Sequence, residues 1–511
     1  MTNNNTSDQS NITDIKYQSE LVSITKNAGI TALGFLLLNF FSFISNAIIT
    51  RYLGADDYGL FVLATRILEI VIILSSLGFA TTIVRHVAYF YTRNDHERTK
   101  GTIFYSLKVV FIVSIAGVIL FFILSPLISA KLFNRPEISP FLRILLLSLP
   151  FSMISLVFLS ALNGLKKIKT TITIRNIINP VIFILIVGVV ILFNWGLTGL
   201  MWIYVITGSI SAFLAYLYLR KAYLIKVADH KPLAEKKKLW NFSYPMLFIQ
   251  LFNNIIRLVP IFIMGIYLTN ADIGIFNVSL KIAVLVSFAL EAFAMIFSPV
   301  MAELFSKNDR EMIRKLYKTV TKWIFTFSLV IFFIIILFSD TLLSVFGTEF
   351  IAGSIVLILI AFGELVNAGA GLVGNLILMS GRPKVILANS IFMFILIIVL
   401  CLSLIPAFGL KGAAISVAIT QTTNNLVRLA ELYYYERIHP FKPSYIKPFI
   451  SGVITFILVY LLMSYLTLNN YLELVVGSIF FLVLYAFGNW ALKLDEEDRF
   501  VINILAKYIK R

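Results

Sequence analysis

Long apolar runs separated by short polar segments dominate the chain, and they predict helices that cross a membrane. A helix of about 20 mostly apolar residues spans the hydrocarbon core of a bilayer. Breaking the sequence at its charged and turn-rich positions gives fourteen such runs. They lie at residues 26–50, 58–84, 103–128, 141–163, 173–193, 199–219, 241–268, 273–300, 322–345, 351–379, 385–405, 412–435, 448–466 and 472–492. The pattern predicts an all-α polytopic membrane protein with 14 transmembrane helices.

The basic residues alternate in step with these runs. With the N-terminus in the cytoplasm, the segments on that side hold 33 of the 43 Lys and Arg residues. The opposite connections hold only Arg51, Lys131, Arg135 and Lys411. Cytoplasmic loops of membrane proteins carry such an excess, so the bias predicts an even number of spans with both termini cytoplasmic. It also explains the net charge of +17 without a nucleic-acid partner, and none is expected.

The composition excludes a soluble fold and argues against an enzyme. Hydrophobic residues make up 59% of the 511 and charged residues 14%, against about 45–50% and 25% in soluble domains. The sequence has no phosphate-binding loop, no HExxH motif and one cysteine, Cys401, so we expect no catalytic residues, cofactor or metal. The polar first 20 residues lack a signal-peptide pattern, so the N-terminus is expected in the cytoplasm. The low cysteine content and the lack of a transit-peptide pattern favour a prokaryotic plasma (inner) membrane.

An internal repeat organises the spans. Residues 52–67 match 267–282 at an offset of 215, and residues 196–207 match 409–420 at an offset of 213. Each repeat holds six predicted spans, so both halves insert in the same orientation. Paired bundles of this kind occur in transporters, with the substrate path between them. The predicted parts are an N-terminal segment (1–25), a first six-helix bundle (26–219), a basic linker (220–240), a second bundle (241–435), two extra helices (436–492) and an interfacial helix (493–511).

Polar residues inside the spans predict a cationic cavity between the halves. A charge within hydrocarbon is costly and usually faces a cavity or a partner. Arg66 and Lys281 occupy equivalent repeat positions, and Arg257 lies near the middle of its span. Structural ion pairing, as between Arg66 and Glu69, and hydrogen bonding between helices are the alternatives. The candidate substrate-binding residues are Arg66, Arg257, Lys281, Asn39, Asn254 and Gln250.

Two acidic residues in spans have no cation near them in the sequence. These are Glu291 and Glu364. A buried carboxyl group holds its proton more tightly, so either residue could titrate or bind a cation. Both are therefore candidates for coupling transport to H⁺ or Na⁺.

Several motifs, taken in order, resemble the oligosaccharide flippases. The stretches RYLGADDYGLF (51–61), SSLGFATTIVRHVAYF (75–90), ELFSKNDREMIRKLYK (303–318) and GLKGAA (409–414) carry the likeness. These flippases are polysaccharide biosynthesis proteins of the multidrug/oligosaccharidyl-lipid/polysaccharide exporter superfamily. The resemblance implies a protein that moves a lipid-linked oligosaccharide from the cytoplasmic to the outer leaflet, with membrane lipids and glycan-assembly enzymes as further partners.

Three other functions stay open. A lipid II flippase would also have fourteen spans and a cationic cavity. A drug/cation antiporter of the same superfamily normally has twelve spans and acidic binding residues. A non-transporting scaffold for glycan-assembly enzymes is disfavoured by the short loops and by charges within both halves.

Overall fold

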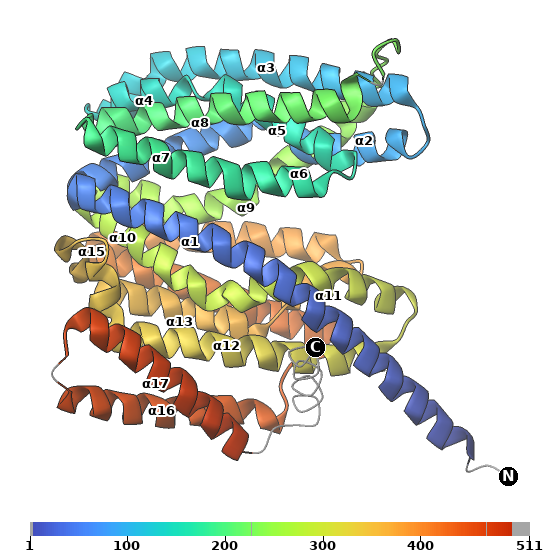
Figure 1. Cartoon of the computed structure of the whole chain (residues 1–511), viewed down its shortest axis with the longest axis vertical. Helices are drawn as coiled ribbons and strands as arrows, with labels where there is room; N and C mark the ends of the chain where they lie inside the picture. Colours follow the sequence, from blue (N-terminus) through green and yellow to red (C-terminus); the bar gives the residue numbers. More distant parts are fainter. Residues whose placement is uncertain (1–3, 226, 467, 493–511) are drawn as a thin grey trace. The chain divides into compact units, whose positions relative to one another are not determined.

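The computed structural model describes the backbone of residues 4–225, 227–466 and 468–492, and side chains from residue 39 onward except at 253, 295, 296 and 299. The described residues form helices and connections, with no strand among them (Figure 1). The predicted interfacial helix at 493–511, with its apolar face of Phe500, Val501, Ile504, Leu505 and Tyr508, lies outside the described residues.

Seventeen α-helices are present in the described chain, with six short 3₁₀ or π segments between them. The α-helices are α1 (Asn4–Ser76), α2 (Phe79–Tyr91), α3 (His96–Leu127), α4 (Ile138–Leu146), α5 (Leu149–Gly164), α6 (Ile168–Ile172), α7 (Asn179–Leu192), α8 (Gly196–Leu219), α9 (Lys236–Tyr267), α10 (Asn270–Ala283), α11 (Phe288–Ser306), α12 (Arg310–Ser344), α13 (Ser354–Ala370), α14 (Val373–Met379), α15 (Pro383–Glu436), α16 (Ile446–Tyr465) and α17 (Asn470–Ala491).

These helices form two compact units. The N-terminal unit comprises Leu37–Ile275 with Ile397–Gly409, so it contains α2–α9. The C-terminal unit comprises the described residues of Met1–Leu36, Phe276–Leu396 and Leu410–Arg511. Helix α9, which corresponds to the seventh predicted span, thus belongs to the compact unit built mainly from the first repeat. The predicted bundle boundaries remain predictions.

The described residues include 11 helices that are long and apolar enough to cross a membrane, or 12 when the bent helix α9 is included. Fourteen spans therefore stays a prediction. The difference arises partly where a single element runs through two predicted spans, at Asn39–Ser76 and at Pro383–Glu436. Each contains one glycine with non-helical backbone angles, Gly54 (φ 74°) and Gly409 (φ 58°).

Hydrogen bonds show that both long elements fold back on themselves. In α1 the Tyr58 hydroxyl donates to Asn46 Oδ1 at 2.9 Å, although twelve residues of straight helix would span about 18 Å. In α15 Asn389 donates to the Glu431 carboxylate at 2.6 Å across 42 residues. Positive φ is accessible to glycine at little cost, so one residue suffices for each reversal.

The two units contain a matching corner that supports the internal repeat. Asn94 and Asn308 both have positive φ, 57° and 55°, and each is followed by an aspartate that caps the next helix. Asp95 accepts a hydrogen bond from the Arg98 amide at 3.0 Å, and Asp309 accepts one from the Met312 amide at 3.2 Å. Asn308 follows Asn94 by 214 residues, which lies between the repeat offsets of 213 and 215 found in the sequence.

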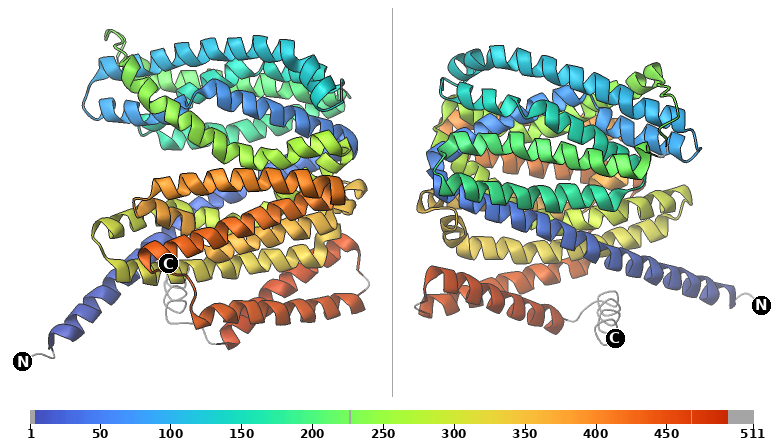
Figure 2. Two further views of the ribbon diagram at one scale, coloured as in Figure 1. Left: turned by 180° about the vertical axis from the view of Figure 1, so that it is seen from behind. Right: turned by 45° about the horizontal axis from the view of Figure 1, so that its top comes forward.

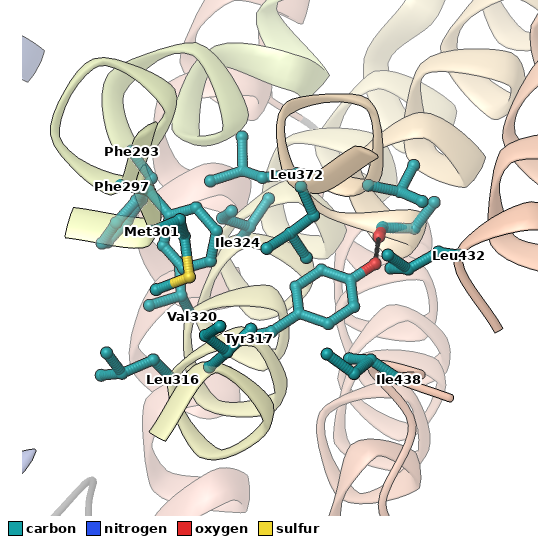
Figure 3. Close-up of a cluster of buried hydrophobic side chains, with 14 of the residues drawn as sticks. Phe293, Phe297, Met301, Leu316, Tyr317, Val320, Ile324, Leu372, Leu432 and Ile438 are labelled. Carbon is teal, nitrogen blue, oxygen red and sulfur yellow. Dashed lines mark hydrogen bonds between the residues drawn. The ribbon is translucent and has the colours of Figure 1, made fainter. Parts of the chain in front are cut away.

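The C-terminal unit is held together by a large apolar core. Side chains of α11, α12, α14 and the end of α15 meet there, and Phe297, Met301, Leu316 and Val320 are almost fully buried (Figure 3). The Tyr317 hydroxyl crosses this core to donate to the Ala370 carbonyl at 2.7 Å. Helices α16 and α17 of the same unit lie against each other (Figure 2), and Tyr485 of α17 donates to the Thr326 carbonyl of α12 at 3.2 Å.

Candidate functional site

The matching repeat motifs contact each other reciprocally within the N-terminal unit. A side chain at Gly59 would collide with the backbone of Asn270, and one at Gly274 would lie 2.5 Å from the Ala55 carbonyl oxygen. Gly274 is the repeat equivalent of Gly59, and Asn270 is the equivalent of Ala55. We call the part of α1 after Gly54 its second limb. Two glycines in equivalent positions therefore let the start of α10 approach this limb at backbone contact distance.

Polar groups at this end of the unit fix the contact. Arg135, from the predicted outward connection, donates to the carbonyls of Gly265 and Leu268 at the end of α9. Burial lowers the pKa of Arg135 from its ordinary value, but that value is so high that the side chain remains charged at neutral pH. A cation on the last carbonyls of a helix is favourable. Arg135 thus ties the connection between α3 and α4 to the contact between the repeats.

Arg66 follows this contact along the second limb of α1. Its guanidinium donates to the Glu69 carboxylate at 2.7 Å, and the side chains are 27% and 36% exposed. The expected ion pair within one helix is therefore present. Tyr204 of α8 packs close by, with its ring 6.0 Å from that of Phe61. Arg66 is partly accessible and partly neutralised.

The polar positions of the first predicted span have structural partners. Asn46 donates to the Ser42 carbonyl at 2.6 Å and accepts from Tyr58, so it bonds across the reversal at Gly54. Asn39, half-buried on the same limb, also has a bonding partner. Asn46 therefore stabilises the reversal within α1.

The residues Gln250, Asn254 and Arg257 form a polar stripe on α9 that is more accessible than Asn46. Gln250 donates to the Thr81 hydroxyl of α2 at 3.2 Å, and Asn254 donates back to the Gln250 carbonyl at 2.8 Å. Arg257, one turn further, is exposed. The helix is bent by 43° between Lys236–Phe252 and Asn254–Tyr267. The bend lies within the stripe, and it places Gln250 and Arg257 on different arms of the helix.

The remaining candidates lie in the C-terminal unit. Lys281 is half-buried on α10, and Glu291 is exposed near the start of α11. Glu364 of α13 accepts a hydrogen bond from the Ser287 hydroxyl, in the 3₁₀ turn (Val284–Ser287) between α10 and α11. The two acids thus have different surroundings. Glu291 is exposed, whereas Glu364 is hydrogen-bonded to the 3₁₀ turn between α10 and α11.

Sequence reasoning missed one buried cation. Lys322 of α12, the first residue of the predicted span 322–345, is 6% exposed. It has an interaction partner, as does the buried Asn277 of α10. The apolar run that begins directly after Lys322 was the available signal that it lies inside a helix bundle.

The predicted substrate-binding residues include three cations, which are suited to an anionic ligand. Arginine can pair with phosphate through two hydrogen bonds, and lysine provides a point charge. Within the part of the chain that the structure describes, no group of three His, Cys, Asp or Glu side chains could hold a metal ion. These arginine and lysine side chains are suited to binding a charged, polar ligand.

Two curated proteins are similar to parts of the chain. The chain is 24% identical over 227 residues to the "Probable low-salt glycan biosynthesis flippase Agl15" of Haloferax volcanii, over 44% of this chain and 48% of that protein. It is 25% identical over 278 residues to the "Capsular polysaccharide biosynthesis protein CapF" of Staphylococcus aureus, over 54% and 68% respectively. The chain thus spans about half the length of the first relative.

The fold is similar to that of a solved transporter. The lipid II flippase MurJ in an inward closed conformation superposes with a TM-score of 0.73 at 15% identity, over 91% of this chain and 98% of that one. At such low identity the likeness concerns the fold alone.

Two family descriptions match the sequence. Residues 245–403 match the MatE family. Residues 24–305, more than half of the chain, match the family described as "Polysaccharide biosynthesis protein". The chain is a multi-pass membrane protein that belongs to the polysaccharide biosynthesis protein family.

Proposed function

We propose that this protein flips a lipid-linked oligosaccharide from the cytoplasmic to the outer leaflet of the plasma membrane, for assembly of cell-surface polysaccharide or glycoconjugate. The observation that carries the proposal is the family match over residues 24–305. The names of both curated relatives, one of them a flippase, and the fold shared with a lipid II flippase support it. The role is transport rather than enzymatic conversion.

The cations supply the recognition. Lipid-linked oligosaccharides carry a phosphate or diphosphate between isoprenoid and sugar, and Arg66, Arg257 and Lys281 provide positive charge for it. Asn39, Gln250 and Asn254 add amide groups that can hydrogen-bond to sugar hydroxyls. The polar head crosses between the two repeats by alternating access while the lipid tail stays in the bilayer. Both termini lie in the cytoplasm, and Glu291 or Glu364 couples the cycle to H⁺ or Na⁺.

A translocation assay tests the proposal. The gene is expressed in a strain that lacks its own oligosaccharide flippase, and lectin labelling of intact cells measures lipid-linked glycan in the outer leaflet. We expect label only when the protein is present. Lipid II added as a second substrate in proteoliposomes separates a general glycan flippase from a lipid II flippase. Absence of outer-leaflet glycan at normal protein levels would contradict the proposal.

One observation favours a second function. The MatE match at residues 245–403 covers Glu291, Glu364 and most of the C-terminal repeat. A drug/cation antiporter would use these acids to bind a cation. Proton- or sodium-dependent efflux of a fluorescent cation, abolished in Glu291→Gln or Glu364→Gln while glycan flipping is absent, would establish this alternative.

A further inference from the structure

A groove on the surface of the N-terminal unit lies apart from the proposed substrate site. It has a volume of about 600 Å³ and is formed between α3 and α5. Four of its lining residues come from one face of α3 and two from α5. They are Phe104, Leu107, Lys108, Phe111, Ile154 and Phe158.

The groove faces outward from the unit. Only 11% of the most apolar stretch of the helix His96–Leu132 is buried. Phe104 and Phe111 are 42% and 41% exposed, whereas Phe158 is buried with its ring 5.8 Å from that of Tyr216. In a membrane-spanning protein, such an exposed apolar face is covered by lipid chains. The groove is therefore a recess in a lipid-facing surface.

The charge pattern of the helix indicates where the groove lies along the bilayer normal. Between Lys108 and Lys131 lie 22 residues with no charged side chain. At 1.5 Å per residue this stretch is about 33 Å long, close to the ~30 Å hydrocarbon thickness. This length would place Lys108, five residues inside the predicted span 103–128, near the headgroups, with aromatic rings on both sides of it along the helix.

The lysine is available to a ligand. Lys108 is exposed, and among the described residues it has no acidic partner within ion-pair distance. We propose that the groove binds an anionic phospholipid of the bilayer, with its phosphate on Lys108 and an acyl chain against Phe111, Ile154 and Phe158. The orientation proposed above assigns this lipid to the cytoplasmic leaflet.

Lipid binding to the purified full-length protein tests this inference without any transport readout. Native mass spectrometry measures retention of phosphatidylglycerol against phosphatidylcholine on wild type, Lys108→Gln and Ile154→Trp, which fills the groove. We expect wild type to prefer phosphatidylglycerol and Lys108→Gln to bind it about fivefold more weakly, the effect of one basic residue at a membrane surface. Ile154→Trp reduces retention of both lipids.

Lys131→Gln is the matched control, because Lys131 bounds the same apolar stretch and is exposed but lies outside the groove. We expect it to keep the wild-type preference. An equal loss in both lysine variants, or equal retention of both lipids by wild type, would overturn the inference. Displacement of phosphatidylglycerol by an equimolar isoprenyl phosphate would also overturn it, since the groove would then serve the isoprenoid carrier. Monodisperse elution of each variant verifies folding.

Discussion

Arg66 has two possible roles that its neighbour can separate. Its ion pair with Glu69 satisfies the charge within one helix, yet about a quarter of the side chain remains exposed. If the pair is only structural, Arg66→Ala and Glu69→Ala should lower the melting temperature to a similar extent and leave transport per folded molecule unchanged. If Arg66 binds the phosphate, Arg66→Ala abolishes transport and Glu69→Ala leaves most of it.

We expect the second result, because an exposed ion pair within a helix contributes only about 0.3–0.5 kcal/mol to stability. The measurement combines thermal unfolding in detergent with glycan translocation, and the double variant Arg66→Ala/Glu69→Ala tests additivity. Loss of transport in both single variants in proportion to loss of folded protein would support the structural role.

Glu436, the last residue of α15, is a buried acid paired with two arginines. Its carboxylate, 3% exposed, pairs with Arg310 at 2.9 Å and with Arg382 at 3.3 Å. Glu436→Gln leaves two arginines without their counter-charge, and we expect a loss of about 1–2 kcal/mol because both arginines are partly solvated. The control is Glu303→Gln, which removes the exposed pair with Lys307 and should change thermal stability little.

Asp95 should make the N-terminal unit sensitive to acid. Burial raises the pKa of this carboxyl, but hydrogen bonds from the Arg98 amide and guanidinium outweigh it and hold the pKa below its ordinary value of 3.8. Its contribution is therefore present above pH 3.8 and is lost as the pH falls through the lowered pKa. Asp95→Ala, which removes the helix cap, should cost about 1 kcal/mol at pH 7.

The pH dependence of thermal unfolding separates the helix-capping role of Asp95 from the effect of its charge. Asp95→Asn keeps an acceptor for the Arg98 amide but cannot titrate. Its melting temperature should therefore fall less steeply than that of wild type between pH 5 and pH 3, within the range where unfolding is reversible. An unchanged slope would show that other carboxylates dominate the acid response.

The helices α1 and α10 depend on two glycines for their close approach. Alanine at Gly59 or Gly274 would force apart backbone atoms that now touch. We expect each variant to be destabilised by about 1–3 kcal/mol, as for overpacked cores. Gly188→Ala is the control, since a side chain there meets nothing within 4 Å and alanine favours a helix. Thermal unfolding of the three variants provides the comparison.

The sequence predicted the helical elements well and their ends less well. Apolar runs located nearly every helix, because burial in lipid demands an uninterrupted stretch of nonpolar residues. Reversals at Gly54 and Gly409 were placed within a few residues, but the helical hydrogen bonding continues so close to each glycine that one element contains both limbs. The corner at Asn94–Asp95 was overlooked, although its copy at Asn308–Asp309 was quoted within a family motif.

The candidate site residues could be named from the sequence, whereas most of their bonding partners could not. Polar positions within the apolar runs stand out in the sequence, which is why Arg66, Gln250 and Glu364 could be named. Their bonds to Glu69, Thr81 and Ser287 could be inferred only where the partner lies one turn away, as for Glu69. Contacts between distant segments, such as Arg135 with the end of α9, leave no local pattern.

For the molecule as a whole, the proposed mechanism requires positive charge in both repeats. We expect Arg66→Ala, Arg257→Ala and Lys281→Ala each to abolish transport while expression and membrane insertion stay normal, because each removes a charge that would face the substrate phosphate. Lys131→Gln, a cation outside the proposed site, should leave transport unchanged. Wild-type glycan translocation in all three alanine variants would exclude a cationic substrate cavity.

The single-residue reversals at Gly54 and Gly409 also have a biochemical consequence. A protease needs several residues of extended, accessible chain to enter its active site, and helix on both sides of each glycine denies it that length. Limited digestion of the native protein should therefore leave both turns uncut, whichever side of the membrane is exposed. An epitope tag inserted at either glycine would separate limbs that now bond directly.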